Sequence, residues 1–235
     1  MSKKLLINNG GNSVPFDTNL ITYLTAKDLS TGDKSWKNRG SDGDYSLLEG
    51  NVIVENNYLK TGSNVNTGGG LAFGNLNASE FENGTVFAKL QFNAPLQNLS
   101  LFSDCNNQYT GRNLLGIDVR KITNYMGFTH IGIRDLNANI SPYTILGTTK
   151  LGILVWTKED TNLNCRLYYD NTWVENTTSM SVTGLNLSPK VMLCKASFND
   201  LVDKIHNTNI YDIMIYNKFL STTQQQSVVD YLMKE

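Results

Sequence analysis

Apolar and polar residues alternate in short runs along most of the chain, and turn residues separate these runs. In the run from Gly84 to Phe92, one face collects Val86, Ala88, Leu90 and Phe92. A period of two is typical of a β-strand with one face toward a core. Many such short runs in one chain predict an all-β sandwich.

Further strands are expected wherever the same pattern returns. These are residues 20–24, 45–48, 52–54, 58–60, 99–103, 115–121, 125–133, 144–146, 150–158, 164–169, 172–175 and 191–195. The run 150–158 is almost continuously apolar, which suits a strand that is covered on both faces. Asp170 and Asn171 separate two runs and predict a tight hairpin turn, because both residue types tolerate left-handed backbone angles.

The segment from Asn209 to Glu235 predicts a strand followed by a helix. Strict alternation would place Ile210, Asp212, Met214 and Tyr216 on one face of the strand, and Tyr211, Ile213 and Ile215 on the other.

The period then changes. Ser221 is a good N-cap, and Gln224 completes a capping box three residues later. Val228, Val229 and Leu232 form a narrow apolar stripe, so we expect a short helix on the surface of the domain.

Three segments resemble the concanavalin A-like (laminin-G-like) jelly-roll family. The closing segment IYDIMIYNKFLSTTQQQSVVDYL matches the family's ending at Tyr216, Asn217, Lys218, Leu220, Ser221 and Gln224. The segment WKNRGSDGDYSL, from Trp36 to Leu47, resembles the family's Trp and Gly/Asp loop, with Ser41 and Asp42 inserted. The segment LYYDNTWV resembles its LYVNGxxV hairpin at Tyr168, Asp170 and Val174, with Asn171 in place of the usual glycine.

The resemblance spans most of residues 20–235 and implies a two-sheet antiparallel jelly-roll β-sandwich with a short C-terminal helix. We therefore divide the chain into an N-terminal arm, 1–18, and one sandwich domain, 19–235. The arm would pair either with the edge of its own domain or with a neighbouring subunit. Trp36 is expected to plug the core, the alternative being a sugar platform. Lys89 departs from the family, which often has a tryptophan at that position.

The net charge of the chain and the length of its apolar runs exclude some classes of partner. The formal net charge is −1 and no block of Lys or Arg occurs, which argues against nucleic acid or an anionic membrane as a partner. No apolar run is long enough to span a bilayer, and the first residues lack the apolar core of a secretory signal. We expect a protein made in a host cytoplasm. Cys105, Cys165 and Cys194 are expected to be free thiols.

No enzymatic activity is predicted. The glycosidases of this superfamily usually carry Glu-x-Asp-x-Glu on one strand, which places alternate carboxylates in one cleft. The sequence has only Glu80-x-Glu82 and Asp42-x-Asp44, both in expected loops. No cofactor is expected, although the resemblance implies that calcium could bind. The candidate calcium ligands are Asp42 and Asp44, and Asp33 and Asp104 are further candidates. Asx turns are the ordinary role of such loop aspartates.

Sugar binding needs aromatic faces beside planar hydrogen-bonding groups. Three clusters combine these groups: Asn107, Tyr109 and Arg112, with Asn106 and Gln108; Tyr125 and His130, with Asn124; and Asn171 with Trp173. Each cluster also has the ordinary composition of a loop or of a sheet edge.

The resemblance and the asparagine-rich composition together favour a bacteriophage virion component that contacts host glycans without cutting them. Its partners would be a glycan or cell-surface polysaccharide and other virion proteins, reached through residues 1–18, in an oligomeric assembly. The alternatives are a purely structural decoration protein of the virion and a glycoside hydrolase of the same superfamily.

Overall fold

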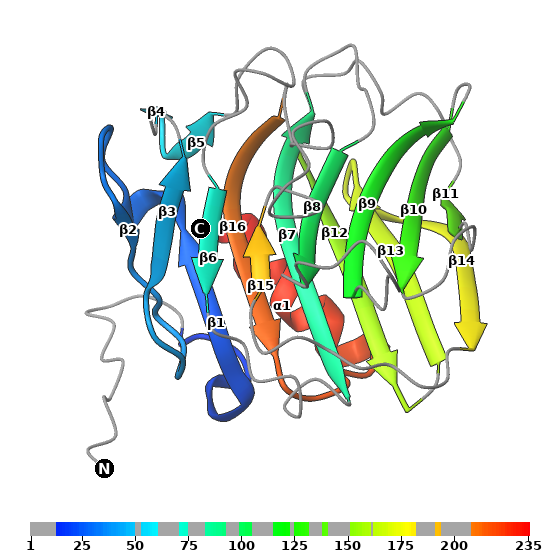
Figure 1. Cartoon of the computed structure of the whole chain (residues 1–235). Helices are drawn as coiled ribbons and strands as arrows, with labels where there is room; N and C mark the ends of the chain where they lie inside the picture. The colour runs from blue at the N-terminus through cyan, green and yellow to red at the C-terminus, as the bar shows by residue number, and fades with distance from the viewer. Residues whose placement is uncertain are drawn as a thin grey trace.

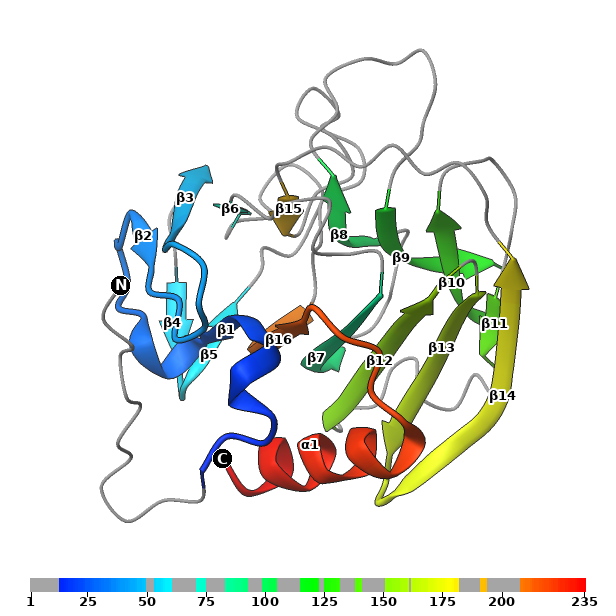
Figure 2. The ribbon, with the colours of Figure 1, turned by 90° about the horizontal axis from the view of Figure 1, so that it is seen from below.

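The computed structural model describes residues 13–49, 53–60, 71–74, 83–92, 99–104, 115–122, 125–131, 138–140, 151–160, 162–181, 191–193 and 208–235. They form three layers, namely one α-helix, a sheet beneath it and a second sheet on the far side (Figures 1 and 2). All strand pairs are antiparallel, so the predicted all-β sandwich with a short C-terminal helix is confirmed.

The sheet next to the helix, which we call the helix-side sheet, has eight strands. Their order is β14 (Thr172–Ser181), β13 (Asn162–Tyr169), β12 (Leu151–Glu159), β7 (Gly84–Phe92), β16 (Thr208–Tyr216), β5 (Tyr58–Lys60) and β4 (Ile53–Glu55), and β1 (Leu20–Thr25) also pairs with β16. The closing strand β16 therefore pairs with strands from both ends of the chain.

The second sheet, which we call the opposite sheet, also has eight strands. Their order is β11 (Ala138–Ile140), β10 (Tyr125–Ile131), β9 (Leu115–Ile122), β8 (Leu99–Asp104), β15 (Val191–Leu193), β6 (Leu71–Gly74), β3 (Tyr45–Glu49) and β2 (Ser35–Trp36). Strands β2, β6 and β11 were not expected from the sequence. The strand expected at 144–146 and the loop around Glu80 lie outside the described residues.

The central strands of the helix-side sheet carry buried residues on both faces. Paired residues of neighbouring strands share a face, so Val86, Ala88 and Ile213 lie on the side of the opposite sheet. Phe87 and Met214 lie on the other side, where they pack with the helix, and both have no exposed surface.

Helix α1 (Thr222–Lys234) forms as the capping box predicts. The backbone N–H of Gln224 donates to the hydroxyl of Ser221, and the backbone N–H of Ser221 donates to Oε1 of Gln224 at 3.0 Å. Val228, Val229 and Leu232 are fully buried against the helix-side sheet. α1 falls short of what a membrane-crossing helix needs, and the described part of the chain offers no other candidate.

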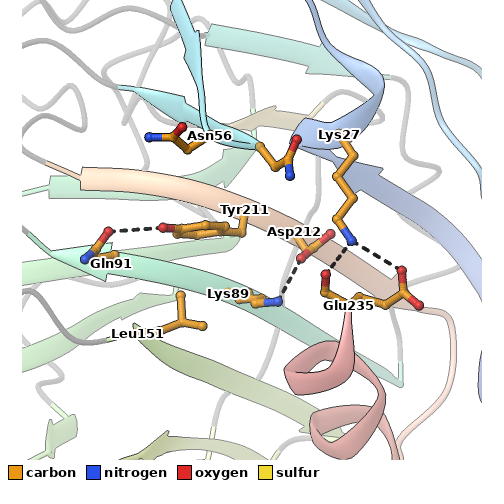
Figure 3. Close-up of a pocket in the computed structure, with 9 residues that line it drawn as sticks. Lys27, Asn56, Lys89, Gln91, Leu151, Tyr211, Asp212 and Glu235 are labelled. Carbon is orange, nitrogen blue, oxygen red and sulfur yellow. Dashed lines mark hydrogen bonds and ion pairs between the residues drawn. The ribbon is translucent and has the colours of Figure 1, made fainter.

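A β-bulge in β16 corrects the predicted faces of that strand. Ile210 pairs with Leu90 and Asp212 pairs with Lys89, so Tyr211 is an extra residue between two pairs. The prediction that Ile210 shares a face with Asp212 is wrong. Ile210 lies with the core side, and the bulge brings Tyr211 and Asp212 together toward the outer face (Figure 3).

Trp36 plugs the core as predicted. Its side chain has no exposed surface, and its indole N–H donates to the backbone carbonyl of Thr25 at 2.8 Å. The prediction of a core role is confirmed.

The loop after Trp36 is organised by the side-chain amide of Asn38. Its Oδ1 accepts from the backbone N–H of Tyr23 at 2.8 Å and of Gly40 at 2.9 Å, and its Nδ2 donates to the carbonyls of Ile21 and Asp42 at 3.0 Å. A Cβ at position 40 would lie 2.4 Å from the carbonyl oxygen of Ile21. Only glycine therefore lets this loop lie so close to β1.

The arm lies partly outside the described residues, which begin at residue 13. Val14 and Phe16 pack against the cluster beneath α1, and the carbonyl of Pro15 accepts from the hydroxyl of Tyr216 at 3.0 Å. The described end of the arm is thus attached to its own domain.

Candidate functional site

A hollow of about 220 Å³ lies on the outer face of the helix-side sheet, beside the last turn of α1 (Figure 3). The central strands β16, β7 and β12 contribute its floor. The turn between β4 and β5, the short 3-10 helix η2 (Ala26–Asp28) and the end of α1 contribute its walls. The lining residues are Lys27, Asn56, Asn57, Lys89, Gln91, Leu151, Tyr211, Asp212 and Glu235.

The position of the hollow follows from where α1 ends. Under the helix, the outer face of β7 and β16 carries Phe87 and Met214, which are fully buried. Past the helix, the same face carries Lys89, Gln91 and Asp212. The sheet thus changes from apolar to polar at the point where the helix no longer covers it.

Lys89 and Asp212 form a buried pair at the base of the hollow. Their side chains are 7 % and 3 % exposed, and Lys89 Nζ lies 3.7 Å from Oδ2 of Asp212. The same ammonium donates to the carbonyl of Leu232 in the last turn of α1. Burial lowers the pKa of Lys89 and raises the pKa of Asp212, while the mutual attraction of the pair opposes both shifts.

Lys27 forms the outer wall with Glu235. Its ammonium donates to the main-chain oxygen of Glu235 and lies 3.5 Å from Oε2 of the same residue. The two side chains are 35 % and 26 % exposed, so this pair remains in contact with solvent.

Tyr211 supplies the aromatic surface of the hollow. Its hydroxyl donates to Oε1 of Gln91 at 3.1 Å, and Nδ2 of Asn209 donates to the same oxygen at 2.9 Å. Its ring centroid lies 5.5 Å from that of Tyr58 and 5.8 Å from Lys89 Nζ. These contacts fix the ring in place, and partial burial raises the pKa of its hydroxyl.

Asn56 and Asn57 line the hollow from the turn between β4 and β5. Both have positive φ, 47° and 64°, which matches a tight hairpin turn. Both side chains are exposed, and among the described residues neither carboxamide has a hydrogen-bond partner. Each therefore has a donor and an acceptor available for another molecule.

The described residues among those predicted to bind sugar do not line this hollow. Asn107, Tyr109 and Arg112 lie outside the described residues. Tyr125 and His130 belong to β10 of the opposite sheet, whereas Asn171 and Trp173 belong to the β13–β14 hairpin of the helix-side sheet.

The β13–β14 hairpin forms as predicted, with positive φ at Asp170 and Asn171. Trp173, however, contacts other parts of the domain. Its indole N–H donates to Oε1 of Gln226 in α1 at 2.6 Å, and the Arg166 guanidinium lies 3.9 Å from its ring centroid. Trp173 thus links the hairpin to the helix, and Asn171 remains exposed at the turn.

Two of the predicted calcium ligands, Asp33 and Asp44, accept backbone hydrogen bonds in the structure. Oδ1 of Asp44 accepts from the backbone N–H of Asn38 at 2.9 Å, and Oδ2 of Asp33 accepts from that of Ser30 at 2.8 Å. The backbone N–H of Asp42 donates to the carbonyl of Ile21. Within the described ranges, no group of three or more His, Cys, Asp or Glu residues could hold a metal ion. Calcium at Asp42 and Asp44 stays a prediction.

Sequence reasoning missed the hollow, although one signal was present. Lys89 and Asp212 interrupt two strands whose other residues are mostly apolar on both faces. A lysine and an aspartate in neighbouring buried strands indicate a buried pair, because these residues are rarely buried without a partner.

No family model and no curated protein sequence matches the chain. Its fold is similar to that of solved structures. Trypanosoma rangeli sialidase in complex with sialic acid matches with a TM-score of 0.65 and 15 % identity, over 95 % of this chain and 34 % of the sialidase.

The binding domain of botulinum neurotoxin DC in complex with SialylT matches with a TM-score of 0.64 and 16 % identity, over 94 % of this chain and 52 % of that one. Botulinum neurotoxin type C, whose cell entry is described as dependent on two ganglioside molecules, matches with a TM-score of 0.63 and 16 % identity, over 93 % and 52 %. The chain therefore spans about a third to a half of these proteins, and at such identities the likeness shows the fold alone.

Proposed function

We propose that this protein is a non-catalytic carbohydrate-binding β-sandwich, and that the hollow beside α1 is its binding site. A sugar has apolar C–H patches ringed by hydroxyl groups, so it needs an aromatic or aliphatic surface with hydrogen-bonding groups around it. Tyr211 and Leu151 provide the apolar surface, and the amides of Asn56 and Asn57 provide the hydrogen bonds.

One observation carries this proposal. The Asn56 and Asn57 carboxamides line the same hollow as the Tyr211 ring, whose position is already set by Gln91 and Tyr58. A preformed site loses little conformational entropy when a ligand binds, which favours affinity. The carboxamide is also suited to hydroxyl groups, because it donates and accepts at once.

The structural neighbours support the same class of ligand. One is a sialidase in complex with sialic acid, one is a binding domain in complex with SialylT, and one is a toxin described as interacting with gangliosides. A shared fold does not establish a shared function, so the residues of the hollow carry the argument.

The absence of catalysis is part of the proposal. The sequence lacks the carboxylate triplet of the superfamily's glycosidases. In the hollow, Asp212 is buried in an ion pair with Lys89, and Glu235 is paired with Lys27. Such carboxylates are poorly placed to protonate a glycosidic oxygen or to attack a sugar. Incubation with fluorogenic sialosides and bacterial polysaccharides should therefore release no product.

For the biological setting, we propose the surface of a bacteriophage particle, with residues 1–18 contacting other virion proteins in an oligomeric assembly. This part rests on the asparagine-rich composition and the family resemblance. Particle fractionation after deletion of residues 1–12 tests this proposal. The shortened protein should still fold but should no longer be incorporated into the virion.

A glycan array that includes bacterial surface polysaccharides tests the binding proposal. Tyr211→Ala should abolish the strongest signals, while Tyr211→Phe, which keeps the ring and loses only the bond to Gln91, should retain most of them. The variants Asn171→Ala and Trp173→Phe test the hairpin as a second contact. A uniformly blank array would favour the structural decoration protein instead.

A further inference from the structure

The hollow has room for a short ligand only. Its volume is about 220 Å³, whereas pockets that enclose drug-sized molecules measure roughly 300–1,000 Å³. This space suits one sugar ring with the hydroxyl groups attached to it. Any further unit of a glycan must then lie outside the hollow, against the surface next to it.

Tyr58 continues the aromatic surface of the hollow onto the neighbouring strand β5. Its ring centroid lies 5.5 Å from that of Tyr211, and the two ring planes are inclined by 55°. Tyr58 does not line the hollow, yet both tyrosines are partly exposed. In β5, Leu59 is fully buried and pairs with Ile210 on the core side. Because side chains alternate along a strand, Tyr58 lies on the outer face of the sheet, as the hollow does.

Polar groups surround the Tyr58 ring. Its hydroxyl donates to Oε2 of Glu55 at 3.2 Å, and the Lys60 ammonium donates to Oε1 of Glu55 at 3.0 Å. The side chains of Glu55 and Lys60 are 43 % and 48 % exposed, so both remain accessible to the hydroxyl groups of another molecule. The bond to Glu55 also holds the Tyr58 ring in position, as the bond to Gln91 holds that of Tyr211.

Resting on the function proposed above, we propose that the protein binds an oligosaccharide of at least two units, with one sugar ring in the hollow against Tyr211 and the next against Tyr58. The angle between the two aromatic rings favours this class of ligand. A rigid planar molecule cannot lie flat on two rings inclined by 55°. Successive sugar rings can take different orientations, because the bonds of a glycosidic linkage rotate, and each ring can place its C–H face on one tyrosine.

Affinities for one glycan at several lengths test the inference. The probes are the glycan with the strongest array signal and the same glycan shortened from either end, down to the methyl glycoside of a single sugar. Titrations followed by NMR give the dissociation constants. For the wild-type protein, the affinity should rise at least about tenfold from one unit to two.

Tyr58→Leu keeps an apolar side chain and removes the flat ring. It should abolish most of this gain and leave the affinity for the single sugar unchanged. Tyr58→Phe is the matched control, because it keeps the ring and loses only the bond to Glu55, and it should retain the gain. Tyr211→Ala should weaken binding at every length.

Equal affinities of the wild-type protein for one unit and for two would overturn the inference and leave the proposed function standing. This comparison needs no variant, so it decides even if Tyr58→Leu does not fold. A gain that persists in Tyr58→Leu would also overturn the inference. So would an equal loss for the single sugar and the longer glycans, because Tyr58 would then only hold Tyr211 in place. No binding at any length would instead reject the proposed function, and the inference with it.

Discussion

The ammonium of Lys89 donates to the backbone carbonyl of Leu232, so a side chain of the central strand β7 caps the last turn of α1. The final carbonyls of a helix have no partner within the helix, and a cation near them is also favoured by the helix dipole. One residue therefore fixes the end of the helix and, through Asp212, the base of the hollow.

Lys89→Met should lower the free energy of unfolding by about 3 kcal/mol, because it leaves Asp212 as a buried charge without its partner. The double variant Lys89→Met/Asp212→Leu should recover part of this loss, since it also removes the unpaired charge. Urea unfolding of both variants measures the difference. A double variant less stable than Lys89→Met would contradict the paired role.

Gly40→Ala should destabilise the protein by about 2 kcal/mol, because the new Cβ would meet the carbonyl oxygen of Ile21 at 2.4 Å and the backbone must move. Gly43→Ala, in the same loop, is the matched control, since no atom lies within 4 Å of a Cβ there. In thermal unfolding, the melting temperature of Gly40→Ala should therefore be lower than that of Gly43→Ala. Equal melting temperatures would mean that the loop does not lie against β1 as described.

Gln226→Ala should cost about 1 kcal/mol, the contribution of one partly buried hydrogen bond. This partly buried bond joins the indole N–H of Trp173 to Oε1 of Gln226 and links the β13–β14 hairpin to α1. The exposed bond from Nε2 of Gln226 to Oδ1 of Asp230, within the helix, is lost as well and contributes little. Thr223→Ala, at an exposed position of the same helix, is the comparison and should change stability much less. Hydrogen exchange of the hairpin amides should accelerate in Gln226→Ala alone; equal exchange in both variants would argue against the link.

Stability should fall as the pH rises above about 10. Burial raises the pKa of Tyr23, Tyr45 and Tyr216 well above the usual value for tyrosine. Above pH 10 the unfolded chain releases protons that the folded chain keeps. Unfolding then becomes easier with pH, by up to about 1.4 kcal/mol per pH unit for each tyrosine.

Urea midpoints at pH 9, 10 and 11 measure this slope. Tyr216→Phe removes one of the tyrosines with a raised pKa, so its stability should depend less on pH than that of the wild-type protein. It should also be less stable at pH 7, because the bond to the carbonyl of Pro15 is lost. Equal slopes for the two proteins would show that Tyr216 titrates normally.

Local features of the fold were predictable from sequence. The alternation in β7, the Asp170-Asn171 turn and the Ser221–Gln224 capping box each depend on residues close together in the chain. The bulge in β16 was not predictable. One extra residue leaves the apolar pattern almost unchanged, yet it moves Ile210 to the other face.

The hollow could not be located from sequence because it depends on contacts between distant segments. Lys27 meets Glu235, and Lys89 meets Leu232, across most of the length of the chain. The departure of Lys89 from the family pattern was visible, but its partner Asp212 was expected only as one residue of an alternating strand. Trp173 was predicted as an aromatic site residue because nothing in the sequence shows that its ring packs against Arg166 and that its indole N–H is bonded to α1.

The most direct test of the central claim is a crystal structure with the oligosaccharide that gives the strongest array signal. The account predicts that a sugar ring lies against Tyr211, with hydroxyl groups within hydrogen-bonding distance of Asn56 and Asn57. A sugar bound elsewhere on the sandwich, with the hollow occupied only by solvent, would contradict it.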